Sequence, residues 1–225
     1  MPDSRSPSEP SQHEQPAWGP PPGARGTEGA PVPVHRRSLE FEAFDHGDTV
    51  SVTARLRDDR PWAAAAGSVE HVHDMELEVE VTKADLTIVA ARATMGRFPH
   101  AECPDITSAF GAMVGLRVGR GYTRAVQERF AGPAGCTHLD QMARAIGPVV
   151  VQAVTSCRAM TRDWAALGDA ANSPTFFSRN TCHVWADDGP AQRKVAAGWR
   201  PGMGGYPAPP VAVVLRQRDG GDQRA

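Results

Sequence analysis

Three short stretches of this sequence combine histidine, cysteine and aspartate at spacings that suit metal binding or acid–base chemistry. They are "EHVHDM" at residues 70–75, "AECPDI" at 101–106 and "AGCTHLD" at 134–140. Imidazole nitrogens and thiolate sulfurs bind zinc and iron, and the same groups transfer protons or attack electrophiles. Each stretch also has an ordinary structural interpretation, so the elements that carry them must be considered.

The first stretch places two histidines at the start of a predicted strand. His71 and His73 are two residues apart, so in an extended chain they project to the same face. Asp74 follows directly and could orient one of the imidazoles. We therefore expect His71 and His73 as metal ligands, with His73 and Asp74 in catalytic roles. The alternative is a solvated strand end.

The other two stretches place a cysteine just before a predicted helix. Free N–H groups and the helix dipole favour the thiolate at Cys103 and Cys136. His138 lies in a first helical turn, where the neutral ring that ligates metal or accepts a proton is favoured. We expect Cys103, Cys136 and His138 as metal ligands and His138 as a catalytic residue. The alternative is that both cysteines fill helix ends and His138 lies at the surface.

The remaining cysteines have less chemical context. Cys157 falls on the apolar face of a predicted helix and is expected in the core. Cys182 and His183 lie in a predicted loop, where a structural role is favoured over catalysis.

Two hairpins are predicted upstream of the helices. "RSLEFEAF" and "DTVSVTARLRD" flank the turn residues "DHG", which indicates the first. In the second, apolar residues alternate with glutamates over 75–81, and the strand returns over 86–94.

The period then changes to that of helices. One helix is predicted behind Pro104, a short one over 122–130, and a long one from Thr137 through residue 157. Thr137 and Asp140 form a capping-box pattern, and Pro148 predicts a kink. Strands followed by helices indicate an α+β fold, a small antiparallel sheet packed against helices.

Composition sets the domain organisation. Residues 1–34 are rich in Pro, Ser and Gly and are predicted to be disordered, 35–215 to form one α+β domain, and 216–225 to fray. The net charge of −2 gives no case for nucleic acid or an anionic membrane. No apolar run could span a bilayer, and no signal-like N-terminus is present, so a cytoplasmic protein is expected.

Residues 35–200 resemble a bacterial family of unknown function, family 2889. The resemblance is carried by "HDMELEVEV", "CPDI", "MVGLRVGRGY" and "GCTHLDQM". It implies a shared fold and supplies no mechanism.

Residues 71–155 also resemble the NifU-type iron–sulfur scaffold fold. In this resemblance "MELEVEV" takes the place of the scaffold strand, Cys103 and Cys136 those of the second and third cysteines, and His71 and His73 those of the first cysteine and the aspartate. It implies a NifU-like core with an added N-terminal hairpin and C-terminal extension. Because histidine replaces a cysteine, the resemblance implies zinc or a single iron rather than a cluster.

Two functions follow as hypotheses. The first is a small enzyme with a His/Cys pocket, metal-dependent or not, doing lyase or hydrolytic chemistry on a small organic substrate. Aromatic residues of the extension, Trp185, Trp199 and Tyr206, could form its lid. The second is a non-catalytic metal-binding or scaffold protein. A partner-binding module with core cysteines is the third, plainer alternative.

Overall fold

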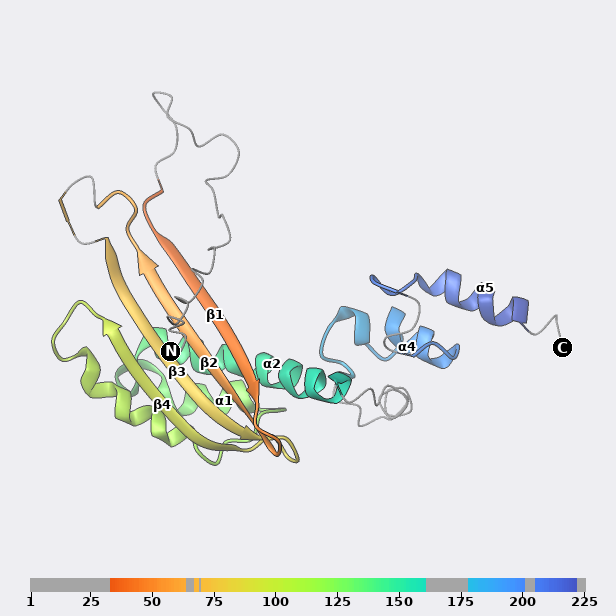
Figure 1. The fold of residues 1–225 in the computed structure, drawn as a ribbon, viewed down its shortest axis with the longest axis horizontal. Coiled ribbons are helices and arrows are strands. Elements are labelled where there is room, and N and C mark those ends of the chain that lie inside the picture. Colours follow the sequence, from red (N-terminus) through yellow and green to blue (C-terminus); the bar gives the residue numbers. More distant parts are fainter. Residues whose placement is uncertain (1–32, 64–66, 69, 161–177, 201–204, 222–225) are drawn as a thin grey trace, which may run out of the picture.

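The chain is seen in a computed structural model, which describes residues 33–63, 67–68, 70–160, 178–200 and 205–221. The predicted N-terminal tail, residues 1–34, therefore falls outside the described residues except for its last two positions. Four strands are followed by helices along the chain, which confirms the α+β class predicted from the sequence. Figure 1 shows the strands side by side with helical segments packed against them.

The four strands form one antiparallel sheet in the order β1-β2-β3-β4. Each strand pairs with the next along the chain, and both predicted hairpins are present. The bounds are Arg36–Asp45 for β1, Thr49–Asp59 for β2, His71–Thr82 for β3 and Ile88–Arg97 for β4.

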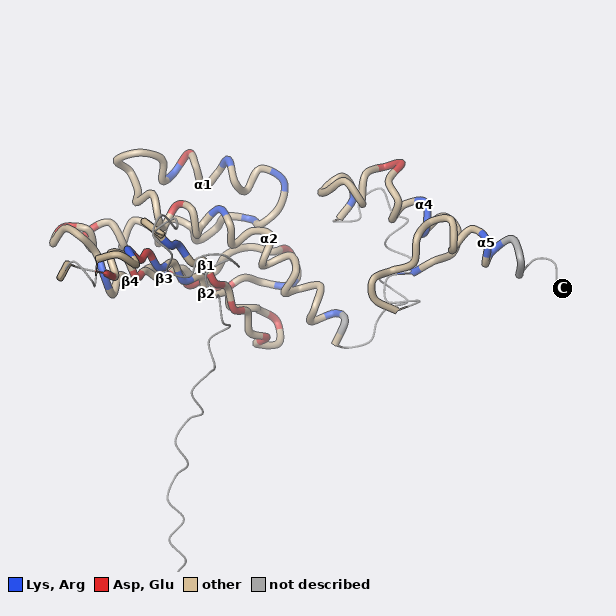
Figure 2. Tube along the Cα trace, turned by 90° about the horizontal axis from the view of Figure 1, so that it is seen from above, with Lys and Arg blue, Asp and Glu red and all other residues tan. Residues whose placement is uncertain are grey.

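Alternation along β2 and β3 gives the sheet two chemically different faces. The buried apolar residues alternate with exposed or half-buried ones and so share an inner face, while the glutamates of β3 share the outer face. The helices cover the inner face (Figure 2). The buried inner residues are Val50, Val52, Ala54 and Leu56 on β2 and Met75, Leu77, Val79 and Val81 on β3.

Helical segments cover the inner face in two layers (Figure 2). Both η1 and α2 contact the sheet, and α1 packs on α2. Among the described residues, no helix is both long enough and apolar enough to cross a membrane. The bounds are Cys103–Met113 for η1, Tyr122–Phe130 for α1, Gly132–Ala134 for η2 and Thr137–Met160 for α2.

Two details differ from the predicted helices. The segment behind Pro104, η1, is a 3-10 helix rather than an α-helix. The long helix α2 contains Pro148 and continues on both sides of it. The Tyr122 hydroxyl donates to the Ala143 carbonyl oxygen at 2.8 Å, and a Cβ on Gly147 would lie 2.8 Å from the Tyr122 ring, so α1 and α2 pack very closely.

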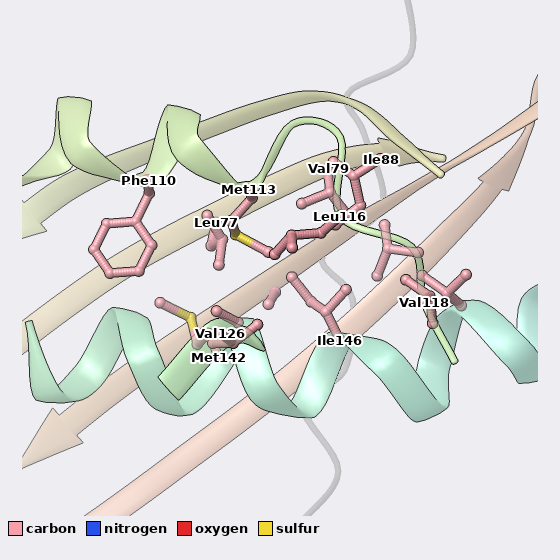
Figure 3. Close-up of a cluster of buried hydrophobic side chains, with 14 of the residues drawn as sticks. Leu77, Val79, Ile88, Phe110, Met113, Leu116, Val118, Val126, Met142 and Ile146 are labelled. Atoms are coloured by element: carbon pink, nitrogen blue, oxygen red, sulfur yellow. The ribbon is translucent and has the colours of Figure 1, made fainter. Parts of the chain in front are cut away.

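The core lies between the sheet and the helices (Figure 3). Its residues come from β2, β3 and β4 of the sheet and from η1, α1 and α2. Phe110 and Phe130 stack with ring centroids 4.4 Å apart. Labelled members of the cluster are Leu77, Val79, Ile88, Phe110, Met113, Leu116, Val118, Val126, Met142 and Ile146.

The C-terminal segment has its own small apolar cluster. Trp185 and Trp199 pack around Val195, which is 1% exposed. The helical elements are η3 at His183–Trp185, α4 at Pro190–Ala196 and α5 at Val211–Gly221. Because α5 extends through Gly221, part of the stretch predicted to fray, 216–225, is helical.

Candidate metal site

A buried aspartate near the end of β2 is the centre of the candidate site. Asp58 follows Leu56 at an inner position of the strand, and its side chain is 1% exposed. Its cross-strand neighbour on β1, Arg37, donates from Nε and from a terminal nitrogen to the two carboxylate oxygens, at 2.7 Å each. Bidentate pairs of this kind are among the strongest and most directional contacts a carboxylate can make.

The charge state of Asp58 follows from two opposing effects. Burial raises the pKa of this carboxyl, because it removes water from the charged form. Hydrogen bonds from Arg37 and His73 outweigh burial and lower the pKa from 3.8 to about 2. Asp58 is therefore an anion at neutral pH.

Two imidazoles lie beside the same carboxylate oxygen. His73 is the cross-strand partner of Asp58 on β3, and its Nδ1 lies 2.9 Å from Oδ2. His138 comes from the first turn of α2, and its Nε2 lies 3.5 Å from the same oxygen. The two ring centroids are 4.0 Å apart. Potential ligand atoms of all three residues lie within 4.8 Å of one another, so one ion could contact all three.

The environment of His138 favours its neutral ring. Burial lowers the pKa of this imidazole, and electrostatic interactions with His73 and Arg37 lower it further, against the opposite effect of Asp58. A neutral imidazole has a free lone pair, which is the form that binds metal.

Two further polar side chains fix Arg37 and Asp58. His35 Nε2 lies 3.2 Å from Asp58 Oδ1. The other terminal nitrogen of Arg37 donates to Gln141 Oε1 on α2 at 2.8 Å. The site therefore joins β1, β2, β3 and α2, and the orientation of the carboxylate is set from several sides.

Cys136 stands at the edge of this cluster. Its Sγ lies 3.7 Å from His138 Nδ1, the ring nitrogen that does not face Asp58. The preceding residue must be glycine, because a Cβ on Gly135 would lie 2.2 Å from the Phe130 carbonyl oxygen. The close turn between α1 and α2 therefore fixes the positions of Cys136 and His138, which directly follow it.

The start of α2 differs from the predicted capping box. The helix already includes Thr137, and the first helical hydrogen bond runs from the Asp140 N–H to the Cys136 carbonyl oxygen at 2.8 Å. The Asp140 carboxylate pairs with Arg144 one turn later. Cys136 thus occupies the position at which Thr137 was predicted.

The structure separates the two strand histidines that were predicted to share a face. The β2–β3 register shifts so that Asp58 pairs with His73 and Asp59 with His71. Neighbours on β2 point to opposite faces, so His71 lies on the outer face. There its Nδ1 is 2.6 Å from Asp59 Oδ1. The same-face prediction was wrong because the bulge around Val72 adds one residue to β3.

Asp74 does not orient a histidine. It lies on the outer face and accepts hydrogen bonds from Arg55 Nε at 2.9 Å and from a terminal Arg55 nitrogen at 2.6 Å. The orienting role predicted for it belongs to Asp58.

The other predicted or considered site residues lie apart from the cluster around Asp58. Within the described residues, Cys103 is not part of any group of three or more potential ligands, and its N–H is bonded to the His100 carbonyl oxygen. Cys182 is exposed beside η3, and Tyr206 is exposed. Trp185 belongs to the cluster around Val195.

Sequence reasoning missed Asp58, Arg37 and His35. A signal for Asp58 was present, because the alternation of Val50, Val52, Ala54 and Leu56 continues onto an aspartate. A charged residue at an inward position of a strand is rarely buried without a partner. That position predicts a buried polar site even before the partners are known.

Comparison with known proteins gives a family and no function. No curated protein and no solved structure matches the chain. The predicted likeness to the NifU-type fold is not confirmed by these comparisons and stays a prediction. A family model described as a protein of unknown function, DUF2889, matches residues 35–152, which is more than half of the chain and includes every residue of the cluster around Asp58. The chain belongs to the DUF2889 family.

Proposed function

We propose that this protein binds a zinc or iron ion between Asp58, His73 and His138 and uses it in hydrolytic or lyase chemistry on a small organic substrate. The observation that carries the proposal is the convergence of three potential ligand atoms, from two strands and a helix, within 4.8 Å. Clusters of exposed acids are common without metal, but here the carboxylate is buried and faces two imidazoles.

The donor set supports these metals. Two imidazole nitrogens and one carboxylate oxygen are used by proteins for catalytic zinc and for mononuclear non-haem iron. An iron–sulfur cluster requires thiolates, and in the described part of the chain no cysteine belongs to the group around Asp58. Three protein ligands leave positions for water or substrate, where the ion activates water or polarises a carbonyl.

The partners of Asp58 also suit a ligand carboxylate. Arg37 donates to both carboxylate oxygens and His35 lies at Oδ1, while the imidazoles of His73 and His138 lie beside Oδ2. Residues that hold a ligand from behind orient it and tune the affinity of the metal.

Elemental analysis of anaerobically purified protein tests the proposal. The wild-type chain is expected to carry zinc or iron, and His73→Ala and His138→Ala to lose most of it. The matched control is His71→Ala, which removes a histidine of the same strand from the outer face and is expected to keep the metal. Wild-type protein that holds no metal, and takes up neither ion on reconstitution, contradicts the proposal.

A non-catalytic metal-binding protein is the second candidate. The observation that favours it is that two surface hollows of the described residues lie on the outer face of the sheet, and neither is lined by Asp58, His73 or His138. One is lined by Phe44, His46, Thr49, Ser51, Glu78, Glu80, Ala90, Ala91 and Arg92, and the other by Arg55, Asp74, Met75, Glu76, Thr94 and Gly96. Metal-loaded protein that hydrolyses no ester or amide, but transfers its ion to a metal-free acceptor, would favour this candidate.

Composition supports a cytoplasmic setting without nucleic acid. The four cysteines are free, which suits a reducing compartment. The net charge of −2 gives no electrostatic case for binding nucleic acid.

A further inference from the structure

The two ring nitrogens of His138 face different groups. Nε2 lies 3.5 Å from Asp58 Oδ2, on the side shared with His73. Nδ1 lies 3.7 Å from the sulfur of Cys136. The thiol therefore contacts the nitrogen that would remain free if Nε2 bound a metal.

We propose that Cys136 is a positioning residue of the metal site, whose sulfur accepts a hydrogen bond from Nδ1–H of His138 and so keeps Nε2 as the metal-binding nitrogen. The inference rests on the proposed function, because it assigns a role toward the ion bound there. It makes Cys136 a second partner of a ligand and not a ligand itself.

The chemistry of histidine ligands supports this role. An imidazole bound to metal through one nitrogen keeps its proton on the other, and a partner at that proton fixes the ring orientation and raises ligand basicity. Carboxylates, carbonyl oxygens and water are the usual partners. Asp58 cannot serve here, because it lies on the Nε2 side of His138. In the described part of the chain, the side chain that lies beside Nδ1 is that of Cys136.

The position of the sulfur argues against direct coordination. A zinc–sulfur bond is about 2.3 Å long, so a ligand sulfur must lie among the other ligand atoms. Among the described residues, the group whose atoms lie within 4.8 Å of one another contains Asp58, His73 and His138 and excludes Cys136.

The backbone holds Cys136 where this role needs it. Its carbonyl oxygen accepts the first helical hydrogen bond of α2, from Asp140. Gly135 before it has no space for a side chain. The Cys136 side chain packs against the core cluster, so the thiol cannot easily turn toward the ion.

The spectrum of the cobalt(II)-substituted full chain separates the two roles of Cys136. A coordinating thiolate gives an intense sulfur-to-cobalt charge-transfer band in the near ultraviolet, whereas a positioning thiol gives none. We expect the visible bands of bound cobalt without the charge-transfer band. A charge-transfer band that disappears in Cys136→Ala overturns the inference and makes Cys136 a ligand.

Zinc affinity measured by competition with a chromophoric chelator tests the effect of the contact. Loss of such a partner typically weakens metal binding about tenfold to a hundredfold, so Cys136→Ala is expected to fall in that range. Cys136→Ser keeps an acceptor at Nδ1 and is expected to recover most of the loss. The matched control is Cys157→Ala, a partly buried cysteine at the other end of α2, which should leave the affinity unchanged.

A double mutant shows whether Cys136 acts through His138. In a His138→Ala background, Cys136→Ala is expected to cause no further loss of zinc affinity, because the contact it removes no longer exists. Additive losses would contradict the inference, as would an unchanged affinity in Cys136→Ala. Wild-type protein that binds neither zinc nor iron refutes the proposed function itself, whereas tight binding that does not depend on Cys136 refutes this inference alone.

Discussion

The two ends of the sheet each place an aspartate on the inner face, yet the two carboxylates have different surroundings. Asp58 is 1% exposed and is held by Arg37 and two imidazoles. Asp45, at the end of β1, is 38% exposed and pairs with Lys83. Only at Asp58 does protein replace water around the charge.

Both carboxyls nevertheless have a lowered pKa. At Asp45, hydrogen bonds from Lys83 and from the Gly47 N–H lower the pKa to about 2, with little opposition from burial. At Asp58, burial is the largest effect and raises the pKa, but Arg37 and His73 overcome it. The comparison teaches that a low pKa alone does not identify a functional carboxylate, whereas a low pKa reached against burial marks a preorganised one.

The largest difference between the two ends should appear when the cation is removed. Arg37→Met leaves a buried anion without its main partner, which is expected to reduce the free energy of unfolding by about 3 kcal/mol. Lys83→Met exposes Asp45 to water and should have a much smaller effect. Urea unfolding at pH 7 measures both. Equal losses in the two variants would show that the buried and exposed pairs do not differ as described.

Zinc should stabilise the folded chain through the end of the sheet that contains Asp58, and not through the end that contains Asp45. An ion that binds only the folded chain raises the free energy of unfolding by about 2.7 kcal/mol at a hundred times its dissociation constant. We expect this increase in the wild type and in Asp45→Asn, and its absence in His73→Ala. Thermal unfolding with and without zinc is the measurement, and stabilisation that persists in His73→Ala would place the ion elsewhere.

Replacing one glycine by alanine at each end of the sheet should separate the cost of a steric clash from the cost of backbone strain. Gly135→Ala forces a Cβ against the Phe130 carbonyl oxygen and is expected to destabilise the fold by about 2 kcal/mol. Gly47 has φ of 82° but open space around it, so Gly47→Ala should lose only about 1 kcal/mol from backbone strain. Chemical unfolding measures the loss in free energy of unfolding for both variants. A larger loss in Gly47→Ala than in Gly135→Ala would contradict the prediction.

The smallest effect concerns acid stability at the exposed end. The folded pKa of Asp45, about 2, lies below its ordinary value of 3.8, so its contribution to stability is present above about pH 4 and is lost as pH falls toward 2. The stability difference between wild type and Asp45→Asn should therefore be present at pH 7 and vanish near pH 2. Urea midpoints across this range test it, and a constant difference would contradict it.

Periodicity was sufficient to predict the elements, because the pattern is local. Alternation through Leu77 and Val79 identified β3, and the helical spacing of Met142 and Ile146 identified α2. The partners at the site come from segments far apart in the sequence, such as Arg37 and Gln141, and their meeting depends on how α2 crosses the sheet. No local pattern contains that information.

The site was predicted only in part for the same reason. His73 and His138 were candidate ligands, and the structure brings them together with Cys136 nearby. Cys103 was included because it precedes a helix, as Cys136 does, but the position before a helix does not fix which other side chains a thiol meets, and Cys103 lies outside the cluster. A bulge does not change the hydrophobic pattern, so the different faces of His71 and His73 could not be read from spacing.

The bulge between β2 and β3 affects how related chains should be aligned. The extra residue of β3 is Val72, which has no partner on β2. The part of β3 before Val72 can therefore gain or lose a residue while Asp58 still pairs with His73. The inner histidine of a family member is therefore found by counting back two positions from the alternating run that begins at Met75. A search for the H-x-H spacing would instead discard any relative that keeps the inner histidine and has lost its outer neighbour.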